Sequence, residues 1–159
     1  MEYETISENC KIKWIRNYKL TTEKYKQVSG FIFDEDDKLL IVKSDDVWTL
    51  PGGHPELYEY AVGTLIREVL EEACVGIKNI KYLGAVEVVE DDMKYYQLRF
   101  VAKVNEVYKF KAGYETNDRK FVEINHLKDY IKWYDGITFQ NQLNDALMLL
   151  SNLNKNQDI

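Results

Sequence analysis

Alternating apolar and polar residues mark several stretches of the chain, and this period of two predicts β-strands. Stretches 25–33 and 38–43 are rich in β-branched and aromatic residues, and the charged DEDD between them predicts a hairpin. Stretches 80–89 and 95–104 flank EDDMK and predict a second hairpin, and 119–124 predicts a last short strand.

The predicted strand at 95–104 has the clearest alternation. One of its faces carries Tyr96, Leu98, Phe100, Ala102 and Val104, and the other carries Gln97, Arg99 and Lys103. Side chains that alternate in this way lie on opposite faces of a sheet. The pattern therefore predicts one face that packs in the core and one that is wet or contacts a ligand.

An amphipathic helix is predicted at 60–73, where apolar residues recur at the helical spacing of three and four. The residues expected on its core side are Val62, Leu65, Ile66 and Val69. Two further helices are predicted at about 126–133 and 139–152. This order of strands and helices predicts a mixed β-sheet covered by helices, an α/β fold of the α/β/α sandwich kind.

The composition of the chain indicates a globular domain. It has 159 residues, of which 45% are hydrophobic and 30% charged, and this length suits one domain with its own core. No Gly/Ser-rich or Pro-rich linker divides it, so we expect a single domain over 1–159. A net charge of -6 argues against a basic nucleic-acid groove, whereas a divalent metal can still supply positive charge for a phosphorylated ligand.

No segment of the sequence indicates export or membrane insertion. The first residues lack the basic start and apolar stretch of a signal peptide, and no apolar run approaches the roughly 18 residues of a membrane span. Cys10 and Cys74 are too few and too far apart for a disulfide framework or a zinc cluster. We therefore expect a cytoplasmic protein without a membrane partner.

Three glutamates crowd the end of the predicted helix at 60–73. Glu68, Glu71 and Glu72 stand three and four residues apart, so they project together and repel one another by roughly a few tenths of a kcal/mol per pair. Converging carboxylates suit Mg²⁺ or Mn²⁺, which bind carboxylates, water and phosphates. From the spacing alone, a solvated acidic helix face is the alternative.

The residues around these glutamates extend the pattern. Gly53 is followed after five residues by Glu59, and after seven more by REVLEEACV at 67–75. This spacing resembles the signature box of the Nudix hydrolases, which has a glycine, a glutamate and an Arg-Glu-apolar-any-Glu-Glu-any-Gly-apolar ending. Six of its seven fixed residues are present, and WTLPGG at 48–53 is similar to the lead-in of that family. The predicted element order also agrees with a Nudix-type sandwich.

The resemblance implies a role for each residue of the box. The metal ligands would be the carbonyl of Gly53 and the carboxylates of Glu71, Glu72 and Glu68, the last of which could instead accept a proton. Arg67 would orient a glutamate rather than touch substrate, and its spacing of four from Glu71 permits this pairing. Glu59 would order the loop before the helix, where a negative charge is also favourable on its own.

The reaction implied by the resemblance is hydrolysis of a nucleoside diphosphate linked to another group X, with Mg²⁺ or Mn²⁺ as cofactor. The partner would be that small molecule, and a homodimer is possible because related proteins often pair. Many family members use a further acid on a loop before the last strand, for which Glu115 is the first candidate and Asp118 the second. A catalytically weak Nudix-fold domain that binds a nucleotide or regulates is the alternative function.

Two residues depart from the family pattern. Cys74 stands where the box has a glycine that ends the helix in the left-handed conformation. Either Cys74 adopts that conformation at a cost of about 1 kcal/mol, or the helix continues and Gly76 ends it, and we expect the second. Tyr58 stands where members commonly have glycine, so its ring could crowd the loop or border the substrate.

Two other residues are weaker candidates for substrate binding. His54 follows the glycine pair and could reach a phosphate, although loop histidines are more often exposed. Arg99 lies on the polar face of its predicted strand and could also meet a phosphate, with exposure to solvent as the alternative. The identity of X is not readable from these residues.

Overall fold

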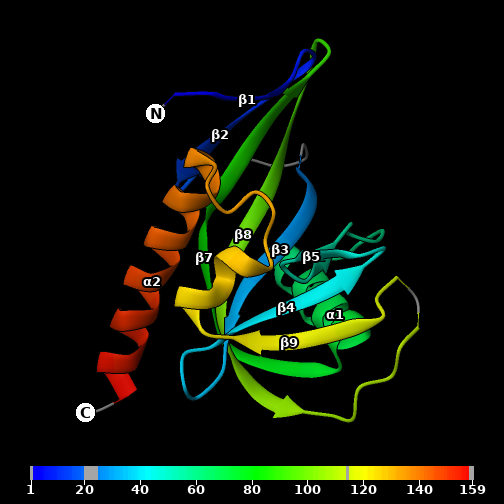
Figure 1. The fold of residues 1–159 in the computed structure, drawn as a ribbon, viewed down its shortest axis with the longest axis vertical. Coiled ribbons are helices and arrows are strands. Elements are labelled where there is room, and N and C mark those ends of the chain that lie inside the picture. Colours follow the sequence, from blue (N-terminus) through cyan, green and yellow to red (C-terminus); the bar gives the residue numbers. More distant parts are fainter. Residues whose placement is uncertain (1, 20–24, 114, 158–159) are drawn as a thin grey trace.

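The computed structural model describes residues 2–19, 25–113 and 115–157, and within them nine strands form one sheet (Figure 1). The strands are β1 (Glu4–Ser7), β2 (Cys10–Arg16), β3 (Tyr25–Phe33), β4 (Leu39–Ser44), β5 (Val47–Thr49), β6 (Gly52–Gly53), β7 (Val75–Glu90), β8 (Met93–Val107) and β9 (Asp118–Val122). The helical elements are α1 (Ala61–Ala73), the 3-10 helix η1 (Ile124–Asp129) and α2 (Ile137–Gln157).

The sheet is mixed, as the sequence predicts. Its order is β1-β2-β7-β8-β3-β4-β5, with β6 beside β3 and β9 beside β4. Only the pairing of β3 with β8 is parallel among the described strands. The predicted second hairpin, β7 with β8, is longer than expected and turns at Asp91 and Asp92. This hairpin is the longest pairing in the sheet and supplies its centre.

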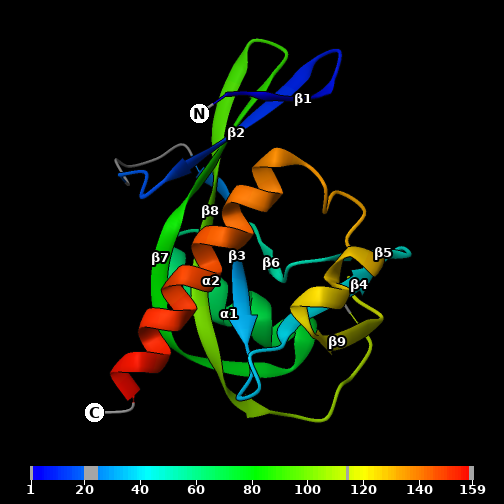
Figure 2. The same ribbon diagram turned by 60° about the vertical axis from the view of Figure 1, so that its left-hand side comes forward.

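The sheet separates two hydrophobic cores. Alternate residues of β3 contribute to each, with Phe31 and Phe33 in the core beneath α2 and Val28 and Ile32 in the core beneath α1. In Figure 2, α2 lies in front of the sheet and α1 behind it. The predicted α/β/α sandwich is therefore confirmed.

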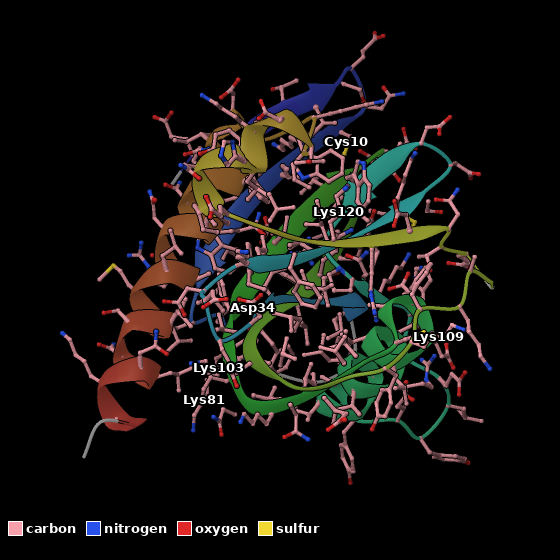
Figure 3. All side chains as sticks on the ribbon, turned by 60° about the horizontal axis from the view of Figure 1, so that its bottom comes forward. Cys10, Asp34, Lys81, Lys103, Lys109 and Lys120 are labelled. Atoms are coloured by element: carbon pink, nitrogen blue, oxygen red, sulfur yellow. The ribbon has the colours of Figure 1, made fainter. Side chains whose placement is uncertain are left out.

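The predicted first hairpin forms only at its tip. β3 and β4 pair at Phe33 and Leu39 alone, and β4 then turns away to pair with β9 and β5. The carboxylate of Asp34, labelled in Figure 3, closes the turn by accepting two backbone N–H groups at 2.9 Å. Because the two strands diverge, the edge of β3 that pairs with β4 at Phe33 is free of β4 at Val28 and Ser29, where it pairs with β6.

The core side of α1 differs from the expectation. Leu65 and Val69 are fully buried, but Val62 and Ile66 are 40% and 43% exposed. The apolar stripe of this helix is wider than the area that the sheet covers, so a pattern of apolar spacing alone placed Val62 and Ile66 wrongly.

The ends of the chain also differ in detail from the expectation. The hairpin of β1 and β2 was not predicted, and the helix expected at 126–133 is the shorter η1. The last predicted helix forms as α2 but extends beyond 139–152 at both ends. No helix in the described part of the chain is long and apolar enough to cross a membrane.

Candidate functional site

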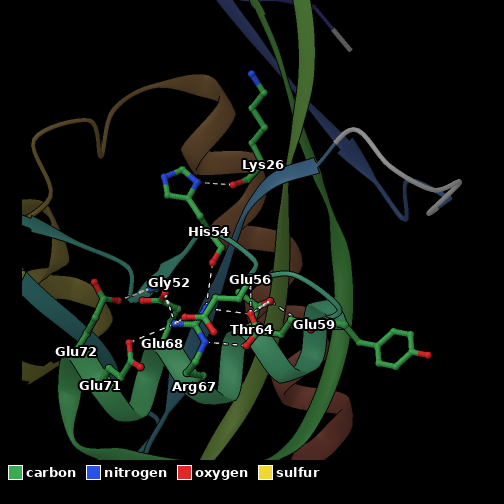
Figure 4. Close-up of polar contacts among 11 residues, drawn as sticks. Lys26, Gly52, His54, Glu56, Glu59, Thr64, Arg67, Glu68, Glu71 and Glu72 are labelled. Atoms are coloured by element: carbon green, nitrogen blue, oxygen red, sulfur yellow. Dashed lines mark hydrogen bonds and ion pairs between the residues drawn. The ribbon is translucent and has the colours of Figure 1, made fainter.

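A pocket of about 360 Å³ brings together most of the sequence-predicted site residues. We call it the acidic pocket, and it is lined by Gly53, His54, Glu68, Glu71, Glu72 and Glu115. Three of its glutamates come from one face of α1, and the glycine comes from β6, which the divergence of β3 and β4 leaves room for (Figure 4). The residues that the family resemblance groups together therefore lie around one space.

The two glycines of β6 let the backbone approach the glutamates. The N–H of Gly52 donates a hydrogen bond of 2.7 Å to Glu72 Oε1. A Cβ at Gly52 would lie 2.2 Å from the carbonyl oxygen of Val28, so no side chain fits there. A Cβ at Gly53 would lie 2.4 Å from Cδ of Glu68. Both positions thus require glycine because backbone and carboxylate are in close contact.

Arg67 holds the glutamates of the pocket in place. Its Nε and Nη2 donate to the two carboxylate oxygens of Glu59 at 2.7 and 2.9 Å. Its Nη1 donates to Glu68 at 2.8 Å and to Glu71 at 3.3 Å, and Nη2 also donates to the carbonyl of His54. The expected pairing with Glu71 is present, and the stronger, bidentate contact is with Glu59.

Glu59 ties the loop before α1 to the helix. Besides Arg67, it accepts hydrogen bonds from the hydroxyl of Thr64 at 2.6 Å and from the N–H of Glu56 at 3.0 Å. The Arg67 bond is the main reason that the pKa of Glu59 falls to about 2. The preceding residue, Tyr58, has a φ of 66°, a region that favours glycine, and its ring is 95% exposed and outside the acidic pocket.

Burial, together with the neighbouring negative charges, raises the pKa of two carboxyls in the acidic pocket. Burial raises the pKa of Glu72 to about 7, the Gly52 N–H opposes this, and nearby Glu68, Glu115 and Glu71 add to it. Burial also raises the pKa of Glu68, against the lowering effect of Arg67. The negative charges here are therefore held together at a cost that a bound cation would relieve.

The carboxylates fit a divalent cation in kind but are not assembled around one. Among the residues that the structure describes, no three acidic, histidine or cysteine side chains converge on a point as metal ligands do. Arg67 engages Glu68 and Glu71, and Gly52 engages Glu72. Carboxylates beside a close backbone carbonyl are the hard oxygen donors that Mg²⁺ or Mn²⁺ prefers. These side chains would have to turn from their present partners to act as ligands.

Thr116 and Arg119, which the sequence patterns did not single out, hold the C-terminal end of α1. The hydroxyl of Thr116 donates to the carbonyl of Glu72 at 2.6 Å. Arg119 Nη1 donates to the carbonyls of Ala73 at 2.7 Å and Cys74 at 3.2 Å. A cation at the C-terminal carbonyls of a helix is favourable. No sequence pattern reports these contacts, because about 45 residues separate the partners.

The contacts of Thr116 and Arg119 bear on the two candidates for the acid on the loop before the last strand, Glu115 and Asp118. Glu115 precedes Thr116 and lines the acidic pocket. Asp118, the second candidate, lies in β9, accepts the N–H of Arg119 at 2.8 Å and does not line the pocket. The geometry thus favours Glu115 over Asp118.

The helix ends at Cys74, contrary to the expectation. Cys74 has φ 57° and ψ 44°, the left-handed conformation, and its N–H donates to the carbonyl of Leu70. The helix does not continue to Gly76, which lies in β7. Cys74 therefore does what a glycine would do here, and the bonds from Arg119 to its carbonyl and to that of Ala73 hold the turn.

The two weaker binding candidates lie in different places. His54 lines the acidic pocket, and its Nδ1 lies 2.6 Å from the carbonyl oxygen of Lys26. Arg99 does not line that pocket; it faces α2, and it is half-buried in the lining of a different cavity. The polar face of β8 is therefore covered by a helix.

Comparison with known proteins identifies the fold family. A model of the Nudix domain matches residues 24–139 of the chain. No functionally curated protein matches it. A solved variant of the pyrophosphohydrolase BsRppH from Bacillus subtilis superposes with a TM-score of 0.76 at 19% identity, covering 91% of this chain and 95% of that one.

Two other solved structures have the same fold. A UDP-X diphosphatase superposes with a TM-score of 0.65 at 21% identity, over 84% of this chain and 66% of that one. An ADP-ribose pyrophosphatase from Streptococcus suis gives 0.58 at 20% identity, over 80% of this chain and 92% of that one. At these identities the likeness concerns the fold, and it agrees with the predicted Nudix-type sandwich.

Proposed function

This chain belongs to the Nudix domain family, and we propose that it is a hydrolase of diphosphate bonds that cleaves a nucleoside diphosphate linked to another group X with the help of a divalent metal. The observation that carries the proposal is the gathering of four glutamates, from α1 and from the loop before β9, beside the backbone of Gly53. Solved relatives named as a UDP-X diphosphatase and an ADP-ribose pyrophosphatase support this substrate class.

The residues that would hold Mg²⁺ or Mn²⁺ are the carbonyl of Gly53 and the carboxylates of Glu68, Glu71 and Glu72. When bound, the ion would neutralise the non-bridging phosphate oxygens and so favour attack at phosphorus. Arg67 keeps the glutamates of α1 at fixed positions through its contacts with Glu68 and Glu71. Burial is the main cause that raises the pKa of Glu72, and the repulsion from Glu68, Glu115 and Glu71 that adds to it favours the binding of a cation.

Hydrolysis also needs a group that takes a proton from water. Water adds to one phosphorus, the bridging oxygen leaves with the other phosphate, and the proton of water passes to a carboxylate. Glu115 and Glu68 both line the acidic pocket, and either can accept that proton at a carboxylate oxygen. Burial raises the pKa of Glu68, which makes its carboxylate a stronger base than an ordinary one.

A domain that binds a nucleotide without cleaving it is the alternative function. Its basis in the sequence is the pair of departures at Tyr58 and Cys74. Both residues take the positive φ that glycine offers, and Tyr58 is 95% exposed and does not line the acidic pocket. These two departures therefore give the alternative little support.

The test is a substrate panel with matched variants. The purified protein is incubated with nucleoside triphosphates, nucleotide sugars, ADP-ribose, dinucleoside polyphosphates and capped RNA, in Mg²⁺, Mn²⁺ or EDTA, and the phosphate-bearing products are followed. We expect turnover of at least one substrate that EDTA abolishes. Glu71→Gln should lower this turnover by about 100-fold or more, because it removes a carboxylate charge from the pocket.

Glu106→Gln is the matched control, because Glu106 is exposed in β8 and outside the acidic pocket. It should turn over substrate like the parent protein. Nucleotide binding without turnover of any panel member would favour the alternative function. If Glu71→Gln and Glu72→Gln bind divalent metal as tightly as the parent, the metal-site assignment is wrong.

A further inference from the structure

A second cavity, of about 410 Å³, lies between the sheet and the start of α2, and we call it the α2 cavity. Its apolar wall consists mainly of Leu50, Val86, Val88, Tyr95, Trp133 and Phe139. This volume and these aromatic walls are typical of sites that take a small molecule with a planar or apolar body. Most of its wall comes from strands and from α2, so the cavity is framed by rigid elements.

Arg99 of β8 brings a positive charge to this cavity. Its nitrogens donate to three glutamine side-chain carbonyls and one backbone carbonyl: Gln142 (from Nε, 3.0 Å), Gln27 (from Nη1, 3.3 Å), Gln97 (from Nη2, 3.1 Å) and Leu98 (from Nη1, 3.2 Å). All of these partners are neutral. They fix the direction of the guanidinium without cancelling its charge.

No carboxylate compensates this charge in the described part of the chain. Burial is the cause that lowers the pKa of Arg99 to about 10, so the side chain is still positive at neutral pH. Glu4 is the acidic residue in the cavity lining, and its carboxylate instead accepts the N–H of Thr138 at the start of α2, at 2.8 Å. Arg99 thus carries a half-buried charge that its protein partners leave unbalanced.

A cation that is partly removed from water without a counter-ion lowers stability. An apolar side chain of similar length would avoid this cost, and a carboxylate partner would reduce it. A guanidinium that neutral groups hold in a fixed direction is instead suited to bind the anionic group of a ligand. Its side chain is already oriented, so binding costs little further conformational entropy.

The α2 cavity adjoins the acidic pocket across one step of the sheet. Ser29 of β3 lines the α2 cavity and pairs with Gly52 of β6 in the ladder. Gly52 donates its N–H to Glu72, and the next residue, Gly53, lines the acidic pocket. The two pockets lie on opposite faces of the sheet, so a molecule whose diphosphate lies in the acidic pocket would reach the α2 cavity around the two-residue strand β6.

We propose that the α2 cavity binds the part of the substrate beyond the cleaved diphosphate, and that Arg99 selects substrates in which this part carries its own phosphate or carboxylate. This inference rests on the proposed function, since it names the substrate class of the same site. It assigns Arg99 to substrate specificity and leaves bond cleavage to the acidic pocket.

The experiment measures ligand binding without metal, so that it does not depend on hydrolysis. In EDTA, the clustered glutamates repel anions, and binding of an anionic probe then reports the α2 cavity. The probes are GMP and AMP for a phosphate, indole-3-acetate for a carboxylate, and guanosine and adenosine as neutral counterparts, each titrated calorimetrically at pH 7. The proteins are the parent, Arg99→Met, Gln97→Glu and Glu71→Gln.

We expect at least one anionic probe to bind the parent and Glu71→Gln at least 10-fold more tightly than the neutral nucleosides. Arg99→Met should lose this preference. Gln97→Glu, which is nearly isosteric, should lose it too, because it sets a carboxylate about where the amide oxygen of Gln97 lies 3.1 Å from Nη2 of Arg99. Both variants should melt at or above the temperature of the parent, since Arg99→Met removes the uncompensated charge and Gln97→Glu pairs it with a carboxylate.

The proposal is overturned if no anionic probe is preferred over the neutral nucleosides, or if both variants bind the anion as the parent does. The two arms, phosphate and carboxylate, tell which anion the cavity takes. Failure of the proposed function would show itself separately, as absence of metal-dependent turnover on the substrate panel. For a substrate found there, Arg99→Met should raise KM at least 10-fold and change kcat less.

Discussion

The acidic pocket and the α2 cavity share the ladder of β3 and β6 as a wall, yet they are built in opposite ways. The acidic pocket collects like charges from one helix, joined by Glu115 from the loop before β9. The α2 cavity holds a single unbalanced cation, fixed by side chains from β3, β8 and α2. One site therefore favours a cation and the other an anion.

This difference suggests how the two sites divide the work of one substrate. Clustered carboxylates next to a close backbone can hold a metal and, through it, a diphosphate. An oriented guanidinium can discriminate between groups attached to that diphosphate. Changes in one site should then alter turnover without altering metal-free binding, and changes in the other should do the reverse.

The largest expected effect that tests this division comes from Arg67→Lys. Lysine keeps the charge but loses the fork that bonds both oxygens of Glu59 while reaching Glu68 and Glu71. Turnover should fall about 10- to 100-fold, the usual cost of losing a residue that positions ligands. Metal-free binding of the preferred anionic probe should stay within about twofold of the parent.

Arg16→Lys is the control for this substitution, because Arg16 pairs with Asp145 at the surface and lines neither pocket. It should leave both measurements unchanged. If Arg67→Lys weakens metal-free anion binding as much as it slows turnover, the two pockets do not act separately and the division is wrong.

The same contrast explains what the sequence could predict of the site. Glu68, Glu71 and Glu72 are neighbours on one helix, so their meeting follows from the 3.6-residue period alone, and the family resemblance adds Gly53 and Glu59. Alternation along β8 also placed Gln97 and Arg99 on one face correctly. Whether that face is exposed to water or covered by a helix depends on the packing of α2, some 40 residues later in the chain.

Contacts between residues that are far apart in the sequence could not be predicted from its patterns. Thr116 and Arg119 stabilise the end of α1 only because β9 lies beside β4, which brings them to the helix. Val62 and Ile66 fit the apolar stripe, yet the sheet covers a narrower part of the helix. Local period fixes which residues share a face, and tertiary packing decides which faces are buried.

An intermediate effect is expected from pH, through Glu72. Its pKa is about 7 in the metal-free fold, above the ordinary 4.5, so between these values the folded state binds more protons than the unfolded state. The stabilising contribution of protonated Glu72 is thus complete below about pH 4.5 and is lost as the pH rises through 7. Thermal melts in EDTA should show this decline, and Glu72→Gln should flatten it between pH 5 and 8.

Adding Mg²⁺ should reverse the trend in the parent, because a cation binds the deprotonated carboxylate, so stabilisation by metal should grow from pH 5 to pH 8. Arg99, whose pKa is about 10, stays charged across this range. Anion binding in the α2 cavity should therefore not follow the same titration. A Glu72→Gln protein with the full pH dependence of the parent would remove Glu72 as its source.

The smallest expected effect lies at Cys74 and tests whether helix-end strain is independent of both pockets. Cys74 holds a φ of 57°, which costs a side-chain-bearing residue about 1 to 2 kcal/mol, whereas glycine takes it freely but loses more entropy on folding. Cys74→Gly should therefore raise the free energy of unfolding by about 0.5 to 1 kcal/mol in urea titrations. Ala73→Gly, one residue earlier and still helical, should lower it by about 1 kcal/mol.

Turnover and metal-free anion binding should be unchanged in Cys74→Gly, because the cysteine lines neither pocket. A loss of turnover there would mean that the turn at Cys74 positions the glutamates of α1, and that the acidic pocket depends on more than the contacts of Arg67.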